Sequence, residues 1–505
     1  MPDVIVVGSG ANGLTAACYL AKAGRQVTLL THGAVGGMAC RHEFSPGYQS
    51  PGILTETSLL RRWVVDDLGL EGHGLRYSVD GQVLAIGQVA DGSAHRLTLS
   101  HDPAATRASI AKLSEKDADS YGRFLEFYQR IGTPITKLLN NIPADVVDPS
   151  SGDLWNLLKR GAQIRRLGKK DMFEVLRLAP MAVYDWLDEW FENDLLKAAM
   201  ALPAVTESYS APWSPGTNAN LLMRQICQGN DVEGGGLALI AALELAARGF
   251  GVTIQNARIA QILPGRGVRT DDGALIEAST IVAGCDPKTV FLKMLDRNEL
   301  PHQFEQRIRN YRTRGLCSQL LLALDAEPTL PGNSGADRIR LLSNLDGIEQ
   351  SFDPIKFGEL PERPSLELYL PSRAHEDLAP HGHAVASVMI HYTPYELTGG
   401  WHSSDRDGLI TRVLGLIDES LPGFSRSVVG RELLTPRDIE ERYGASGGHI
   451  YHGEHALDQL LVRPTPECCQ YRTPFEGLYL CSGGTFPGGG LTCAPGALAA
   501  RAVLD

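Results

Sequence analysis

The chain has 505 residues, of which 43% are hydrophobic and 21% charged, as is typical of a globular protein with room for two domains or one elaborated domain. Its formal net charge of −12 argues against a nucleic-acid partner. No apolar run approaches the ~20 residues of a membrane-spanning helix, and no basic region with a cleavage site precedes the first strand. The nine cysteines and 14 histidines have no metal-site spacing and include no CxxC, so we expect a reduced, cytoplasmic protein without a bound metal.

The N-terminal segment has the pattern of a dinucleotide-binding unit. It comprises an apolar strand over 4–7, glycines at Gly8, Gly10 and Gly13, a helix over 15–23 and a second strand over 27–30. In this pattern the first glycine allows a tight turn, the second lets the backbone approach a pyrophosphate, and the third lets helix and strand pack closely. The helix N-terminus then offers free N–H groups to the phosphates.

The second strand lacks the acid that usually binds the ribose. The expected position is Thr31 or His32, and neither is acidic. Threonine can still hydrogen-bond a ribose, but the charge-assisted bond, worth about 1.5–3 kcal/mol, is lost. We therefore expect a dinucleotide that is held more weakly than is usual. The alternatives are a shifted alignment or compensation by another acid such as Glu43.

Glycines 36 and 37 follow, where the backbone can lie against a ligand. With this segment, residues 4–70 resemble the N-terminal part of the phytoene desaturase-like family of FAD-dependent oxidoreductases. The resemblance implies FAD as cofactor, with Thr31 in the place of the family's ribose-binding acid. The residues that it places on the cofactor here are Gly8, Gly10, Ala11, Asn12, Gly13, Thr31, Gly36, Gly37, Met38 and Arg41.

Residues 101–230 predict a mostly helical insertion over the substrate side of the flavin domain. Parts of it resemble the pyridine nucleotide-disulfide oxidoreductase domain 2 branch of the family, although the chain has no disulfide motif. One basic cluster consists of Lys159, Arg160, Arg165, Arg166, Lys169 and Lys170, beside the apolar residues Leu154, Trp155, Leu157 and Leu158. A solvated helix face is the simpler interpretation, and a peripheral contact with a membrane is the alternative.

The middle of the chain alternates between the two expected domains. A helix over 238–248, several short strands and a hairpin around Asp272-Gly273 resemble the second half of the flavin domain. The resemblance puts the backbone of Ile259 beside the adenine. Strands over 320–324, 366–370 and 384–391 are expected to form the floor of a substrate cavity.

The C-terminal block is a second glycine-rich site. A strand over 477–481 leads into glycine loops and a last helix over 497–504, which again suits an anion or polar ring. The resemblance places Gly483, Gly484, Gly490 and Leu491 on the flavin. Two departures from the family are Phe486, where histidine is common, and the pair Ala497-Leu498 in place of polar residues.

Candidate catalytic side chains over the flavin are His452, Glu454 and Tyr451, with His449 as a weaker candidate. Histidine has a pKa suited to proton transfer at neutral pH. The alternative is that His452 and Glu454 only hydrogen-bond loop backbone. With one dinucleotide fingerprint and no second one, a stable NAD(P)H site is not expected.

Together these patterns predict an α/β fold with a Rossmann-type FAD-binding domain, of the two-dinucleotide-binding-domain flavoprotein kind found in amine oxidases and phytoene desaturases, and an α+β substrate domain. The FAD-binding domain is expected over 1–90, 233–300 and 440–505, and the substrate or cap domain over 91–232 and 301–439. The expected activity is desaturation or oxidation of a small, largely apolar molecule by hydride transfer to flavin N5. Alternatives are a flavin-dependent isomerase and a diverged binding protein without flavin. Association into a homo-oligomer stays open.

Overall fold

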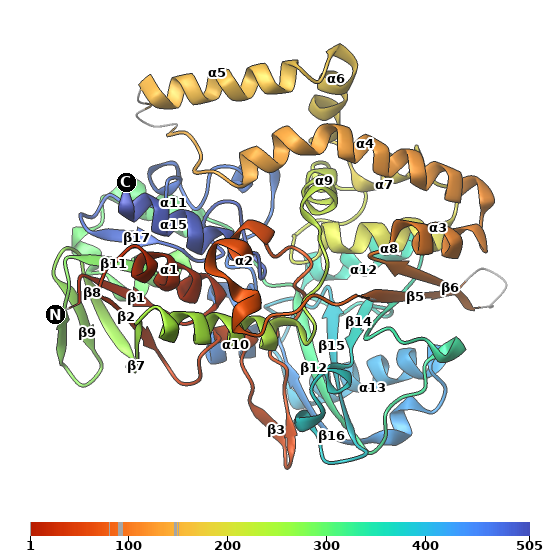
Figure 1. Cartoon of the computed structure of the whole chain (residues 1–505). Coiled ribbons are helices and arrows are strands. Elements are labelled where there is room, and N and C mark those ends of the chain that lie inside the picture. The colour runs from red at the N-terminus through yellow and green to blue at the C-terminus, as the bar shows by residue number, and fades with distance from the viewer. Residues whose placement is uncertain (1, 80, 89–93, 146–148, 150) are drawn as a thin grey trace.

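A parallel sheet forms the centre of one of the two halves of the molecule, the half that contains both chain termini (Figure 1). The computed structural model describes residues 2–505 except 80, 89–93, 146–148 and 150. In spatial order the strands of this sheet are β17 (Leu478–Leu480), β11 (Thr280–Ala283), β1 (Val4–Val7), β2 (Val27–Thr31) and β7 (Thr253–Asn256). All four pairings are parallel, and β1 lies in the middle with every residue buried.

Alternate residues of β1 enter two different cores, as expected for a strand covered on both faces. Val4 and Val6 pack against the helices α1 (Ala11–Lys22), α10 (Gly235–Gly249) and α15 (Ala494–Leu504). Ile5 and Val7 face the antiparallel strands β8 (Ile259–Leu263), β9 (Gly267–Thr270) and β10 (Leu275–Glu277). This three-layer arrangement is a Rossmann-type α/β fold, which confirms the predicted fold class.

A second, seven-stranded sheet lies beside the first. Its strands, in order, are β16 (Val428–Leu434), β12 (Cys317–Leu324), β15 (Ala384–His391), β14 (Leu366–Tyr369), β13 (Arg338–Leu342), β5 (Gln82–Gln88) and β6 (Ala94–Ser100). Only the β13–β5 pair is parallel. The predicted division at residue 90 stays a prediction, but β5 precedes it and already pairs within this second sheet.

The described part of the segment 103–227 forms seven helices. They are α3 (Pro103–Ala111), α4 (Glu115–Leu139), α5 (Ser151–Arg165), α6 (Lys169–Leu178), α7 (Val183–Asp188), α8 (Asp194–Val205) and α9 (Thr217–Cys227). Of these, α8 packs directly on the side of the second sheet that faces the cavities. Buried residues of α4, α7 and α8 share one aromatic-rich core. The opposite side of the sheet is covered by α13 (Ser403–Ser420). The remaining helices are α2 (Arg62–Leu68), α11 (His302–Asn310), α12 (Leu345–Phe352) and α14 (Pro436–Tyr443).

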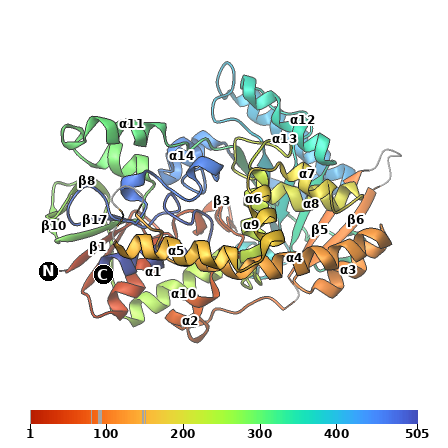
Figure 2. The same ribbon diagram turned by 90° about the horizontal axis from the view of Figure 1, so that it is seen from above.

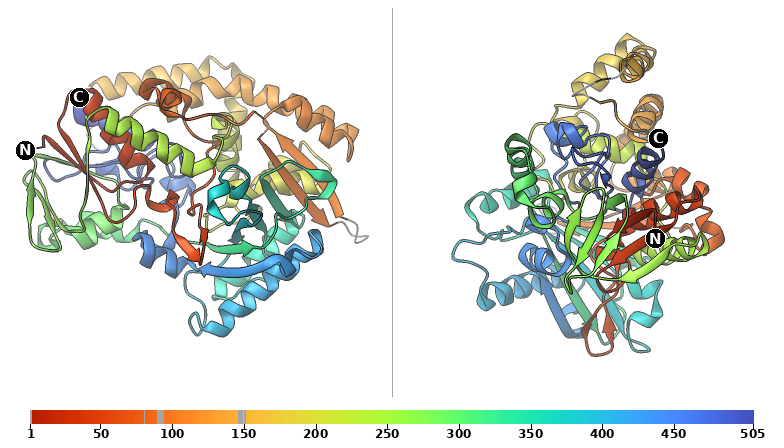
Figure 3. Two further views of the ribbon diagram at one scale, coloured as in Figure 1. Left: turned by 60° about the horizontal axis from the view of Figure 1, so that its bottom comes forward. Right: turned by 90° about the vertical axis from the view of Figure 1, so that its left-hand side faces the viewer.

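Helices α5 and α6 stand apart from the rest of the molecule (Figures 1 and 3), and α5 runs across the middle of the view from above in Figure 2. Together they expose five large apolar side chains, namely Leu154, Trp155, Leu158, Phe173 and Leu176. The described basic residues of the predicted cluster, Lys159, Arg165, Arg166, Lys169 and Lys170, are exposed on the same two helices and the turn between them. The side chains of Leu157 and Arg160 lie outside the described residues. Among the described helices, none combines the length and apolarity needed to cross a membrane.

Candidate functional site

A large cavity lies at the carboxyl ends of β1 and β2, where an open parallel sheet binds ligands. It contains about 2390 Å³ of space that protein atoms leave free. Of the predicted cofactor-binding residues, those that line it are Gly8, Gly10, Ala11, Asn12, Gly13, Thr31, Gly36, Gly37, Met38, Arg41, Ile259, Gly483, Gly490 and Leu491. Segments far apart in the sequence therefore meet around this dinucleotide cavity.

The glycines of the first loop differ in their surroundings. A Cβ atom on Gly10 would meet no atom within 4 Å, so this backbone faces open space. A Cβ on Gly13 would lie 2.0 Å from the carbonyl oxygen of Gly8, so only glycine allows the helix to pack this close. Helix α1 begins directly after Gly10 with no side-chain cap, which leaves its first N–H groups available to an anion. The buried Oδ1 of Asn12, on the same turn, has no hydrogen-bond partner.

Thr31 ends β2 at the position expected for the ribose. Its hydroxyl lies 2.6 Å from the hydroxyl of Ser9, within the dinucleotide cavity. Glu43 is not among the described residues that line this cavity; its carboxylate accepts the N–H of Gly47 inside the β3–β4 hairpin (Glu43–Ser45 and Tyr48–Gln49). The site therefore presents hydroxyl groups where an acid is usual, and it still fits a dinucleotide.

Gly484 is the one predicted cofactor residue that does not line the dinucleotide cavity among the described residues. A Cβ there would lie 2.4 Å from Pro287, and its carbonyl oxygen accepts the hydroxyl of Tyr311 at 3.2 Å. Close packing behind the loop explains this glycine. The departures Phe486, Ala497 and Leu498 are also buried in the core and, among the described residues, do not belong to the lining of either cavity.

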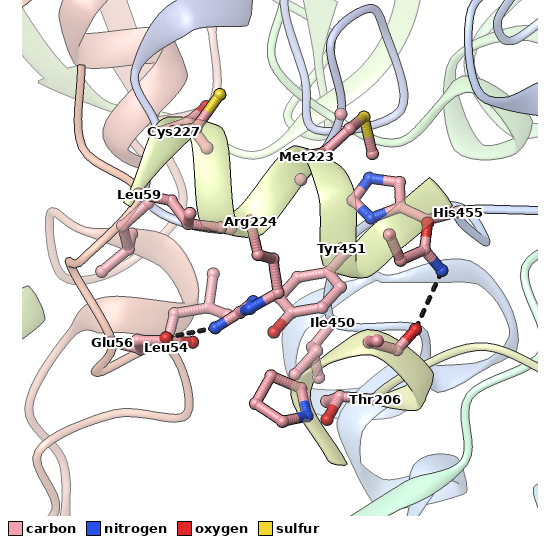
Figure 4. Close-up of a pocket in the computed structure, with 18 of the residues that line it drawn as sticks. Leu54, Glu56, Leu59, Thr206, Met223, Arg224, Cys227, Ile450, Tyr451 and His455 are labelled. Carbon is pink, nitrogen blue, oxygen red and sulfur yellow. Dashed lines mark hydrogen bonds and ion pairs between the residues drawn. The ribbon is translucent and has the colours of Figure 1, made fainter. Parts of the chain in front are cut away.

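A second cavity, the inner cavity, lies on the other side of a shared wall (Figure 4). It contains about 1100 Å³ of free space between the seven-stranded sheet and helices α8 and α9. The shared wall, whose residues line both cavities, consists of Leu54, Ile450, Tyr451, Gly489, Gly490 and Leu491. A Cβ on Gly489 would lie 2.3 Å from that of Tyr451, so the glycine lets the two segments of the wall touch.

One face of the seven-stranded sheet forms the floor of the inner cavity, through β13, β14 and β15; of the strands expected there, those at 366–370 and 384–391 contribute described lining residues, and the strand at 320–324 does not. Because side chains alternate between the two faces of a strand, this face carries the polar and charged side chains Arg338, Arg340, Glu367 and His391, together with Met389. The intervening residues, such as Ile339, Leu368 and Val388, belong to the apolar core beneath α13. Arg340 and Glu367 stand opposite each other on β13 and β14, and Nε donates to the carboxylate at 2.7 Å.

The three predicted catalytic side chains do not meet at one point. Tyr451 lies in the shared wall, and burial raises the pKa of its phenol, so it stays protonated. His452 lines only the dinucleotide cavity; burial lowers its pKa, and its Nδ1 has no partner. Glu454 is 1% exposed, lines neither cavity, and receives two hydrogen bonds from Arg314 at 2.6 and 2.9 Å. Its contacts are those of a structural ion pair, and its catalytic role gains no support.

His449 is bound to Glu207 beneath the wall. Its Nε2 lies 2.9 Å from the carbonyl oxygen of Glu207, and its Nδ1 accepts the backbone N–H of Tyr451 at 3.2 Å. Burial lowers the pKa of His449 to about 4 and raises the pKa of Glu207 to about 8. Both groups are therefore uncharged at neutral pH, and they hold the segment that carries Tyr451.

Several polar residues of the inner cavity are not among those predicted from the sequence. His455 stacks on Tyr451 with ring centroids 6.0 Å apart, and His391 lies on the floor. Nε2 of each ring is buried without a partner, and burial keeps both rings neutral by lowering their pKa, that of His391 to about 4. The missed arginines are Arg61, Arg224, Arg338 and Arg340. The alternation Arg338-Ile339-Arg340-Leu341 was the available signal for a strand with one polar face.

Comparisons with known proteins agree with this geometry. Residues 3–64 match the family model described as DAO, FAD dependent oxidoreductase. The chain is 33% identical to pyridine nucleotide-disulfide oxidoreductase domain-containing protein 2 of Rattus norvegicus, over 99% of this chain and 93% of the relative. It is 28% identical to a limonene dehydrogenase component of Castellaniella defragrans, over 100% and 94%. The crystal structure of an oxidoreductase from Methanosarcina mazei has the same fold, with a TM-score of 0.60, 15% identity and 99% of both chains covered.

The Rossmann-type fold, the glycine cradle at the start of α1 and the family match define an FAD-dependent oxidoreductase. FAD is therefore the cofactor that the dinucleotide cavity is built to hold. More particularly, the chain belongs to the family of pyridine nucleotide-disulfide oxidoreductase domain-containing protein 2. The resemblance seen in the sequence is thereby confirmed.

Proposed function

We propose that this protein oxidises or desaturates an organic molecule in the inner cavity by hydride transfer to flavin N5. The observation that carries the proposal is the shared wall, where the cavity that fits FAD and the inner cavity meet at Tyr451 and Gly490. FAD, when bound, supplies the hydride acceptor. The chain itself supplies binding, orientation and exclusion of water.

The lining of the inner cavity suits a reacting group that is largely apolar. Side chains of Ile53, Leu59, Met223 and Met389 supply apolar surface around the wall. The neutral rings of His391 and His455 present Nε2 as hydrogen-bonding groups, and their lowered pKa values make them weak bases. Two relatives have names that refer to limonene and to 4,4'-diaponeurosporene, which supports an apolar reacting group here.

The first experiment is the visible absorption spectrum of the purified protein, before and after incubation with FAD. We expect flavin bands, and we expect them to bleach when a substrate is added anaerobically. A protein that stays colourless after incubation with FAD would contradict the proposal. Glu441→Gln, at the rim of the dinucleotide cavity, serves as a control for non-specific changes in the spectrum.

An isomerase without net redox change uses the same two cavities, and the same preparation separates it from an oxidoreductase. Turnover that consumes one equivalent of O₂, a quinone or another acceptor per substrate supports oxidation. Turnover without acceptor consumption supports isomerisation. The third alternative, a protein without flavin, was suggested by Thr31, Phe486 and Ala497; of these, only Thr31 lies in the described lining of the dinucleotide cavity, so the departure at Thr31 is the one that bears on FAD binding.

A further inference from the structure

The inner cavity is unusually rich in arginine for a cavity with an apolar reacting group. Its lining includes four arginines, Arg61, Arg224, Arg338 and Arg340, but only two acidic residues, Glu56 and Glu367. Buried charges are costly unless they are paired. The partner of each arginine therefore shows whether its charge serves the protein's own structure or a ligand.

Three of the arginines are paired within the protein. Arg224 donates to the carboxylate of Glu56 (Figure 4). Arg340 donates to Glu367 at 2.7 Å, and Nη1 of Arg338 lies 3.6 Å from the same carboxylate. Asp231 also balances the charge of Arg338. Burial alone would raise the pKa of Asp231, but the hydrogen bond with His101 and the charge of Arg338 bring it to about 2.

Arg61 differs from these three. It is 8% exposed, and among the described residues no carboxylate oxygen lies within 4 Å of its guanidinium nitrogens. Nη1 donates to the carbonyl oxygen of Leu59 at 3.0 Å, while the buried Nε has no acceptor in the described part of the chain. Its other polar neighbour is the thiol of Cys227, whose pKa is raised by burial, so that the thiol is neutral. Arg61 therefore keeps an unbalanced positive charge in the cavity.

The position of Arg61 ties this charge to the inner cavity. Arg61 lines the inner cavity and not the dinucleotide cavity, so the phosphates of FAD are not its partner. Its backbone N–H donates to the carbonyl oxygen of Thr492 at 3.1 Å, in the loop that directly follows the shared wall. Oδ1 of Asn220, on α9 in the lining of the same cavity, is 5% exposed and is also buried without a partner among the described residues. At least two polar groups without a described partner thus line a space that also has apolar walls.

We propose that the substrate carries an anionic head group, a carboxylate or a phosphate, that binds Arg61, and an apolar body that reaches the shared wall. The inference rests on the proposed function, because it assigns the substrate of the same cavity. A guanidinium binds a carboxylate or phosphate through charge-assisted hydrogen bonds, and here the anion supplies the acceptor that Nε lacks. The substrate class is then an amphipathic acid rather than a plain hydrocarbon.

The test compares octan-1-ol, octanoate and octyl phosphate as probes, titrated calorimetrically into the FAD-loaded protein. We expect one of the anions to bind at least about tenfold more tightly than the alcohol, as one charge-assisted hydrogen bond predicts. Which anion binds more tightly decides between carboxylate and phosphate. Equal affinity for all three probes, or binding of none, would overturn the inference.

Three variants assign the preference to Arg61. Arg61→Met should remove it and leave the affinity for the alcohol unchanged, while Arg61→Lys should restore part of it. Arg62→Met is the matched control, because Arg62 is the next residue but is exposed and paired with Asp66 and Glu71. If Arg61→Met does not fold, Arg61→Gln removes the charge and keeps a donor for the carbonyl oxygen of Leu59. A preference that survives loss of this charge would overturn the inference.

The same titration is repeated without FAD, which separates this inference from the proposed function. Absence of flavin bands contradicts the proposed function, whereas the preference for the anion depends on Arg61 and remains measurable. Normal flavin bands with no preference for an anion contradict the inference alone.

Discussion

Glu207 and His449 form a buried pair whose charge state should control how stability depends on pH. Both side chains are fully buried, and Nδ1 of His449 lies 3.6 Å from Oε2 of Glu207. Burial raises the pKa of Glu207 from 4.5 to about 8. The folded protein therefore retains a proton on Glu207 above pH 4.5, where the unfolded chain has released it. In this range the free energy of unfolding falls as pH rises, because the folded state binds more protons.

The size of this effect follows from linkage. One proton of difference changes the free energy of unfolding by about 1.36 kcal/mol per pH unit, so from about pH 5.5 to about pH 7.5 the loss is about 2.7 kcal/mol. His449 acts in the opposite direction below pH 6.5, since its pKa falls to about 4 on folding. Its contribution cancels when wild type is compared with Glu207→Gln, because both proteins keep His449.

Calorimetric melting of wild type and Glu207→Gln at several pH values measures this difference. Glutamine matches the neutral acid in size, so over this range its midpoint should rise relative to wild type by about 3–5 °C, for a cooperative unit of about 250–500 residues. Glu432→Gln is the control. Burial would raise the pKa of Glu432, but His42 and Arg442 bring it to about 2, so its stability contribution is lost only in acid. A difference between wild type and Glu207→Gln that does not change with pH would show that Glu207 is ionised in the folded protein and would refute the reasoning.

Three further predictions concern the cofactor and the protruding helices. Gly10→Ala should fold normally, since its Cβ meets no atom within 4 Å, yet it should weaken FAD binding. Gly13→Ala should weaken FAD binding and also lower the melting midpoint. Visible spectra measure the loss of FAD, and melting curves measure the loss of stability. Thr31→Glu should tighten FAD binding about tenfold or more, through a charge-assisted bond to the ribose, and Glu43→Gln should leave the affinity for FAD unchanged. FAD titration measures both affinities, and a larger change in Glu43→Gln than in Thr31→Glu would contradict this assignment. We also propose that α5 and α6 contact anionic lipid surfaces. Sedimentation with phosphatidylserine-containing vesicles should fall in the double variant Leu154→Ser/Trp155→Ser and remain in Trp213→Ser, which changes a similarly exposed tryptophan elsewhere. Equal sedimentation of wild type and both variants would count against the contact.

The local parts of the fold could be predicted because their signals lie within short segments. The unit β1–α1–β2 and the hairpin at Asp272-Gly273 follow from apolar periodicity and turn residues. The expected start of α1 at Thr15 was late, since the helix begins at Ala11. Asn12 and Gly13 are poor helix formers, but Gly13 is required where α1 packs on the carbonyl oxygen of Gly8.

Long-range pairings could not be predicted in the same way. Strand β5 pairs in parallel with β13, about 250 residues later in the chain, and nothing in either segment identifies the other. The inner cavity depends on such pairings, because its polar floor combines residues of β13, β14 and β15. The dinucleotide residues, by contrast, lie in glycine loops whose spacing is itself the signal. This explains why the cofactor site was largely identified and the arginines were not.

Pro203 shows how a sequence signal was overridden by a distant residue. Proline predicts a break there, yet α8 continues through Pro203 to Val205. A proline in a helix leaves the carbonyl oxygen four residues earlier without its N–H donor. That oxygen belongs to Ala199, and it accepts a hydrogen bond from Nη1 of Arg340 at 3.2 Å. An arginine of the cavity floor thus stabilises the helix that covers the cavity.

This contact bears on the origin of the charges in the inner cavity. Arg340 is satisfied by Ala199 and Glu367 and joins the sheet to α8. Arg338 is satisfied by Glu367 and by the hydroxyl of Thr55 at 3.2 Å, so both arginines have structural partners whatever the substrate is. The same explanation does not extend to Arg61, whose described contacts are one carbonyl oxygen and a neutral thiol. A structural role would be met as well by a neutral donor, without the cost of burying an unpaired charge. The charge of Arg61 is therefore best explained by a ligand that supplies its counterion.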